Sequence, residues 1–255
     1  MTKRRHFGSI RKLPSGRYQA HHLGLDARQH SAPQTFERKR DAELWLSNVE
    51  ASLARGDWFD PQAGRVLLRE YAKAWLEERQ LSPTTYERYG YVLRLHILPT
   101  LGSYAVADIT EPEVRRWRKG LLDAGTGNAT AAKSYRTLRA ILNTAVDDGL
   151  IRRNPCRIKG AGDDKTPERP IVAIDEVFRL AEAIGPRYRA LVLLATLASL
   201  RFGELAALRR SDVDLELRLL RVVRAQTETG GGILRIKEPK TAAGRRTVAV
   251  PEPGA

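Results

Sequence analysis

Short alternating segments open the chain, and a helical repeat follows them. Between residues 7 and 36, β-prone runs such as Ser9-Ile10-Arg11-Lys12 are separated by turn residues, among them Pro14-Ser15-Gly16 and a second turn near Leu25-Asp26. This pattern predicts a three-stranded antiparallel sheet. Over residues 38–54 apolar positions recur at helical spacing and predict one amphipathic helix over one face of that sheet. These positions are Ala42, Leu44, Trp45, Val49 and Leu53.

Helical patterning dominates residues 66–151, where start and stop signals separate four predicted helices. The first covers residues 66–78. The second opens at Ser82-Pro83, an N-cap followed by proline at the first helical position. The third opens at Thr110-Glu111-Pro112-Glu113 with a capping box, and the fourth covers residues 128–148 and stops at Gly149.

A segment rich in Gly, Asp, Lys and Pro follows at residues 159–170 and predicts a flexible linker. Beyond it the pattern indicates helices over residues 175–183, 187–198 and 202–208, then strands over 217–225, 232–237 and 247–250. The predicted fold class is therefore α+β and mainly α. It consists of a small sheet with one helix, a four-helix domain, and part of a mixed α/β domain.

Composition narrows the class of partner. The 255 residues carry a formal net charge of +14 with an ordinary hydrophobic content of 42%. Such an excess of positive charge favours nucleic acid, with an anionic membrane surface as the second candidate. The longest apolar run, residues 190–200, is much shorter than the roughly 20 residues of a membrane-spanning helix, and no signal peptide is evident at the start. We therefore expect a cytoplasmic protein.

Cofactor signals are missing from the sequence. The single cysteine, Cys156, excludes an internal disulfide and is too few for a cysteine-based metal site. There is no Gly-rich phosphate loop and no clustered set of His, Cys or carboxylate ligands. We expect neither a metal nor a cofactor.

The chemistry-bearing residues are basic. Arg201 lies in Ser199-Leu200-Arg201-Phe202-Gly203-Glu204-Leu205-Ala206-Ala207-Leu208-Arg209, and Lys240 lies in Pro239-Lys240-Thr241 between two strand-like runs. Arginine and lysine are the donors that suit a phosphodiester undergoing substitution. The plain alternatives are a structural ion pair of Arg201 with Glu204 or with Asp212 and Asp214, and a solvated lysine in a turn.

The two segments together resemble the tyrosine recombinase or phage integrase family, which carries a Leu-Arg-x-Gly-Glu-Leu-x-x-Leu motif and later a lysine on a β-hairpin. The resemblance implies that Arg201 binds the scissile phosphate and that Lys240 is the general acid, with Arg245 and Arg246 as neighbouring cations. Glu204 would orient a basic neighbour. No metal or nucleotide cofactor would be needed.

The resemblance also implies a domain organisation. Residues 1–60 would be an AP2-like arm-binding domain, 66–157 a SAM-like core-binding domain, 158–170 a linker, and 171–255 the first part of the catalytic domain. The family continues with a His-x-x-Arg element and a nucleophilic tyrosine. This sequence has no histidine after His96 and no tyrosine after Tyr188, which suggests an integrase truncated within its catalytic domain.

Double-stranded DNA at attachment sites is the implied partner. Arg11, Lys12 and Arg17 would act from the N-terminal sheet, because a basic β-ribbon fits the major groove. Lys133, Arg136 and Arg139 share one broad helix face that would meet phosphates, and Arg245 would add another contact. Solvated charges on a sheet or a helix make the same patterns.

Three functions remain open from the sequence. The preferred one is site-specific DNA recombination through a 3′-phosphotyrosine, by a protein that assembles as a homotetramer on DNA when complete. A truncated, non-catalytic DNA-binding protein that occupies integrase sites is the second. Binding of RNA or of chromosomal DNA in general is the third.

Overall fold

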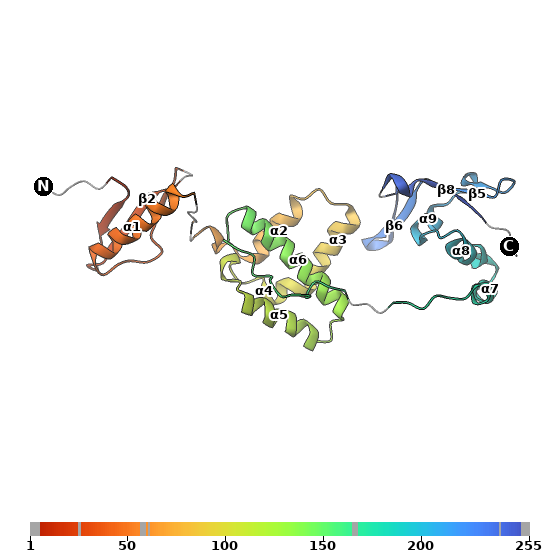
Figure 1. Ribbon diagram of the computed structural model, residues 1–255, viewed down its shortest axis with the longest axis horizontal. Helices are drawn as coiled ribbons and strands as arrows, with labels where there is room; N and C mark the ends of the chain where they lie inside the picture. Colours follow the sequence, from red (N-terminus) through yellow and green to blue (C-terminus); the bar gives the residue numbers. More distant parts are fainter. Residues whose placement is uncertain are drawn as a thin grey trace. The chain divides into compact units, whose positions relative to one another are not determined.

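The computed structural model describes residues 6–24, 27–56, 60, 62–164, 168–239 and 241–250 (Figure 1). Over these residues the chain divides into two compact units. The first comprises residues 1–79 and 91–165, and the second comprises residues 80–90 and 166–255.

The N-terminal part of the first unit is a small sheet with a helix against it. Strands β1 (Ser9–Lys12), β2 (Tyr18–Leu23) and β3 (Gln29–Ser31) form an antiparallel sheet in the order β1-β2-β3. Helix α1 (Lys39–Ala54) packs on β2. The sheet and the helix are confirmed, whereas the expected turn near Leu25-Asp26 lies outside the described residues.

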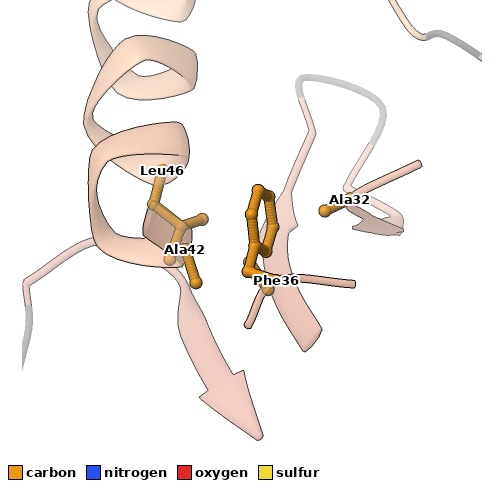
Figure 2. Close-up of a cluster of buried hydrophobic side chains, with 5 residues drawn as sticks. Ala32, Phe36, Ala42 and Leu46 are labelled. Atoms are coloured by element: carbon orange, nitrogen blue, oxygen red, sulfur yellow. The ribbon is translucent and has the colours of Figure 1, made fainter. Parts of the chain in front are cut away.

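Five side chains form the core between this sheet and α1: Ala20, Ala32, Phe36, Ala42 and Leu46. Figure 2 shows the ring of Phe36 between Ala32 and the α1 residues Ala42 and Leu46. Leu44, expected on the apolar face, is 62% exposed. At 100° per residue it points away from the face that Ala42 and Leu46 share.

Residues 68–147 contain α2 (Leu68–Glu77), α3 (Pro83–Val92), α4 (Leu98–Leu101), α5 (Glu111–Asp123) and α6 (Asn128–Asp147). Most of α3, up to residue 90, belongs to the second unit, and the other helices belong to the first. The short 3-10 turn η1 (Ala63–Arg65) precedes α2, and a second one, η3 (Val106–Asp108), precedes α5. The four predicted helices are confirmed. The central helix α6 buries Tyr135, Leu138, Ile141 and Leu142.

One feature of this part was not predicted: α3 runs into a π-helical turn, η2 (Leu93–Ile97), and then into α4. Pro99 follows this turn. Proline has no N–H to donate to the carbonyl four residues earlier, and its ring crowds that carbonyl. The wider π-turn relieves this crowding, so the chain continues as helix.

The C-terminal part of the second unit contains α7 (Ile174–Ala183), α8 (Pro186–Leu197) and α9 (Phe202–Ala207), which confirms the three predicted helices. After the 3-10 turn η4 (Arg210–Asp212), strands β4 (Val213–Asp214), β5 (Leu219–Val222) and β8 (Arg246–Ala249) form an antiparallel sheet in the order β4-β5-β8. Its core contains Ala198, Leu200, Leu220 and Val222.

A separate two-stranded ribbon consists of β6 (Ala225–Thr229) and β7 (Ile233–Lys237), joined by η5 (Gly230–Gly232). The 3-10 turn η6 (Ala242–Gly244) precedes β8. The single strand predicted over residues 217–225 is wrong, because the chain leaves the sheet after Val222 and enters the ribbon at Ala225. Between β5 and β6, Arg224 Nη1 donates a hydrogen bond to the Asp212 carboxylate at 3.0 Å. This bond holds the segment that connects the two strands.

Candidate functional site

Arg201 lies at the junction of α8 and α9. Ser199 has a positive φ of 50°, which is rare for a residue other than glycine. This conformation turns the chain sharply before α9, and Leu200, only 5% exposed, anchors the turn in the core. Arg201 is then the N-cap of α9. Strain of this kind is often found at functional positions.

Glu204, on the first turn of α9, accepts hydrogen bonds from two arginines. Its Oε2 accepts the Arg201 backbone N–H at 3.0 Å, and its Oε1 accepts a bond from Arg201 Nη1 at 3.1 Å. Arg246, the first residue of β8, donates from Nη1 to Oε1 at 3.1 Å and from Nη2 to Oε2 at 2.9 Å. All four acceptor positions of the carboxylate are thereby used.

Electrostatics keep this carboxylate ionised. The Glu204 side chain is 4% exposed, and burial alone would raise its pKa. The hydrogen bonds from Arg246 outweigh burial, and together with those from Arg201 they lower the pKa of Glu204 to about 2. The same hydrogen bond to Glu204 raises the pKa of Arg246. The three groups are therefore charged at neutral pH, with a net charge of one positive unit.

The Arg201 side chain is exposed to solvent although Glu204 binds it. Its side chain is 79% exposed, and in the described part of the chain Glu204 is the one side chain whose carboxylate it contacts. The structural ion pair weighed from the sequence therefore exists, yet most of the guanidinium still faces outward. Asp212, the other candidate partner, is bound to Arg224 and to the Arg209 backbone N–H.

Gly203 allows α9 to lie close to the ribbon. A Cβ at this position would lie 2.6 Å from the carbonyl oxygen of Gln226 in β6, closer than real side-chain carbons approach. The glycine of the motif is thus required for the packing of α9 on β6.

Lys240 lies outside the described residues, between β7 and η6. Arg245 follows η6 and is exposed, with Nη1 3.8 Å from Glu238 Oε1. The structure therefore brings Arg201, Glu204 and Arg246 together and leaves Arg245 on the surface of the same unit.

The predicted residues of the N-terminal sheet have different environments. Arg11 is exposed and pairs with Gln19, which alternates with the buried Ala20, so Arg11 lies on the face opposite α1. Lys12 pairs with Tyr18 on the α1 side, with Nζ 6.0 Å from the Tyr18 ring centre.

Arg17 is engaged within the domain. Its Nε and Nη2 donate to the Oγ1 and the carbonyl oxygen of Thr35, each at 2.6 Å, and Nη1 lies 3.3 Å from Glu37. These bonds tie the start of β2 to the segment that precedes α1.

On α6, Lys133, Arg136 and Arg139 are all exposed on one helix face, as the spacing predicts. Arg136 Nη1 donates to the carbonyl oxygen of Gly162, which fastens the segment after α6 to this face.

No group of three or more His, Cys, Asp or Glu side chains in the described ranges is arranged to hold a metal ion. Over the same residues, no helix combines the length and apolar character that crossing a bilayer requires.

Known proteins resemble both the sequence and the fold. Residues 6–55 match the phage integrase N-terminal domain, and residues 67–122 match the phage integrase N-terminal SAM-like domain. The prophage phiRv2 integrase of Mycobacterium tuberculosis is 39% identical over 257 residues, which cover 98% of this chain and 67% of that protein. The integrase of Mycobacterium phage D29 is 35% identical over 264 residues, covering 98% and 68%.

The chain belongs to the phage integrase family of tyrosine recombinases. Solved structures of integrases share its fold. The Tn1549 transposon integrase in complex with transposon right end DNA gives a TM-score of 0.65 at 23% identity, over 73% of this chain and 62% of that one. A lambda integrase dimer bound to a COC′ core site gives 0.54 at 20% identity, over 92% and 67%.

Sequence reasoning named Arg246 only as a cation near Lys240 and missed its pairing with Glu204. A signal for it exists in the pattern of β8, where Arg246, Val248 and Val250 alternate with exposed residues. Val248 and Val250 pack on the core cluster. An arginine in line with such positions requires a buried anion, and Glu204 supplies it.

Proposed function

We propose that this chain is the DNA-binding part of a site-specific recombinase, and that Arg201 is its phosphate-binding catalytic residue. The observation that carries the proposal is an arginine held by a buried carboxylate while its side chain stays 79% exposed. A guanidinium fixed in this way is preorganised for the nonbridging oxygens of a phosphodiester. Within this family, such an arginine would stabilise the charge that develops when a DNA strand is cut.

The domains would divide the work as the sequence suggests. Residues 1–60 would bind arm-type DNA and residues 66–157 would bind the core site, which the two N-terminal domain matches support. Residues 171–255 would supply the first part of the catalytic domain. On the N-terminal sheet Arg11 is the best placed of the three predicted residues, because its side chain lies on the face that α1 leaves open.

Lys133, Arg136 and Arg139 would contact phosphates from α6, and Arg245 from the segment before β8. Lys240 would protonate the leaving 5′ oxygen, and the tyrosine that forms the 3′-phosphotyrosine would come from the complete catalytic domain. The partner would be double-stranded attachment-site DNA in the cytoplasm. A homotetramer of the full-length protein is supported by the lambda integrase tetramer bound to a Holliday junction, which has a TM-score of 0.51 to this chain.

Competition binding tests this proposal. Fluorescence anisotropy should show tighter binding of the 255-residue chain to DNA spanning its own integration junction than to a scrambled duplex of equal length. On a suicide substrate we expect reversible binding and no covalent adduct, because no tyrosine follows Arg201 in these residues. Equal affinity for both duplexes would reject site-specific recognition, and a covalent adduct would reject the assignment of the nucleophile.

A further inference from the structure

Arg246 fills two acceptor positions of Glu204 that would otherwise draw the Arg201 guanidinium inward. A guanidinium and a carboxylate prefer a two-point pair made by parallel N–H···O bonds. At Glu204 this two-point pair is made by Arg246, with bonds of 3.1 and 2.9 Å. Arg201 donates a single side-chain bond, from Nη1 at 3.1 Å.

The exposed fractions of the two arginine side chains agree with this difference in their bonds to Glu204. The Arg246 side chain is 29% exposed, and that of Arg201 is 79% exposed. If Arg246 were absent, Glu204 would be a buried carboxylate with two free acceptor positions. The donors of Arg201 would then be the nearest to fill them. In that arrangement, the N–H groups of Arg201 that would bind a phosphate would face the protein instead of the solvent.

The backbone of Arg246 is fixed by the sheet. Arg246 pairs with Val222 at the end of the ladder between β5 and β8, and the next two pairs, Arg221 with Thr247 and Leu220 with Val248, are formed. Its Nη1 also lies 3.4 Å from the carbonyl oxygen of Gly244. Arg246, the cation that pairs with Glu204, therefore lies on a strand that the sheet holds in place.

We propose that Arg246 is a positioning residue for DNA strand exchange. It fills the two-point site of Glu204, and the guanidinium of Arg201 thereby stays turned outward for the phosphate. This inference rests on the proposed role of Arg201. It assigns Arg246 no contact with DNA, which distinguishes it from a second phosphate-binding arginine.

A double-mutant cycle on the 255-residue chain separates these roles. We would measure Kd for a short duplex of random sequence over a salt series, since phosphate contacts do not depend on sequence. The variants are Arg201→Ala, Arg246→Met and their combination. Arg224→Met is the matched control, because Arg224 also pairs with a buried carboxylate that caps a turn, that of Asp212.

Loss of Arg201 should weaken binding and reduce the salt slope by about one. Arg246→Met should reduce affinity and slope by nearly the same amounts, and it should add nothing in the Arg201→Ala background. Arg246→Lys should restore part of the loss. Arg224→Met should lower Tm but leave the slope unchanged.

Two results would overturn the inference while the proposed function stands. A slope reduced by about two in the double variant would mean that Arg246 binds a phosphate itself. An unchanged Kd and slope in Arg246→Met would mean that Glu204 holds Arg201 correctly alone. If Arg201→Ala itself has no effect on Kd or slope, the proposed phosphate contact fails, and the inference fails with it.

If Arg246→Met does not fold, combining it with Glu204→Gln removes the unpaired buried charge. Because the neutral side chain no longer draws Arg201 inward, the salt slope of this double variant should lie near that of the wild type, and a slope reduced by about one would mean that Arg246 itself binds a phosphate.

Discussion

Glu204 and Arg246 are 42 residues apart in the sequence and form a two-point ion pair between α9 and β8. This pair directly links the arginine motif to the strand that follows the lysine segment. It joins two stretches that the sequence presents as separate motifs. The consequence for stability is large, because one partner alone would be a charge buried without compensation.

Replacing Glu204 with alanine should therefore destabilise the second unit by about 3 kcal/mol. Thermal unfolding followed by circular dichroism would measure the effect. The control is Glu238→Ala: this carboxylate is 76% exposed and lies 3.8 Å from Arg245, and its removal should cost less than about 0.5 kcal/mol. Equal shifts in Tm for the two variants would show that the Glu204 pair is no stronger than a surface pair.

The same pair predicts a dependence of stability on pH. The pKa of Glu204 is lowered from 4.5 to about 2, chiefly by the hydrogen bonds from Arg246. A group with a lowered pKa in the folded state stabilises the fold above its unfolded pKa and loses this contribution as the pH falls toward the folded value. The difference in Tm between the wild type and Glu204→Gln should thus be full at about pH 6 and shrink as the pH approaches 2. A difference that stays constant over this range would contradict the prediction.

Gly203→Ala should push α9 away from β6, because the new Cβ would meet the Gln226 carbonyl oxygen at 2.6 Å. Overpacking of this kind costs about 1–3 kcal/mol, and DNA binding should weaken with it because Arg201 moves with α9. Gly120→Ala is the control. Gly120 lies within α5, and a Cβ there meets nothing within 4 Å, so this change should stabilise the helix by up to about 1 kcal/mol. Similar losses from both substitutions would show that the approach to Gln226 is not the cause.

Local sequence signals predicted most elements, because caps and periodicity act over a few residues. Ser82-Pro83 and Gly149 marked the ends of α3 and α6 well. These local signals failed where contacts between residues far apart in the sequence determine the structure. The turn at Arg224 depends on Asp212, 12 residues earlier.

The pairing of Glu204 with Arg246 has the same character. The motif around Arg201 indicated an anion site, but nothing in the nine residues from Ser199 to Ala207 indicates which cation stands behind Glu204. That partner comes from β8, whose place beside β5 is set by the sheet and its core.

Arg11 and Arg17 should respond differently to removal, although both were predicted to bind DNA. Arg11 is exposed on the sheet face opposite α1, so Arg11→Ala should change Tm little and reduce the salt slope of DNA binding by about one. Arg17 donates to Thr35 and lies against Glu37, so Arg17→Ala should cost about 1–2 kcal/mol of stability. Melting curves and anisotropy titrations of residues 1–255 give both quantities for each variant. A lower slope for Arg17→Ala at unchanged Tm, with no effect of Arg11→Ala, would reverse the assignment and place the DNA near the start of the central strand β2, where Arg17 lies.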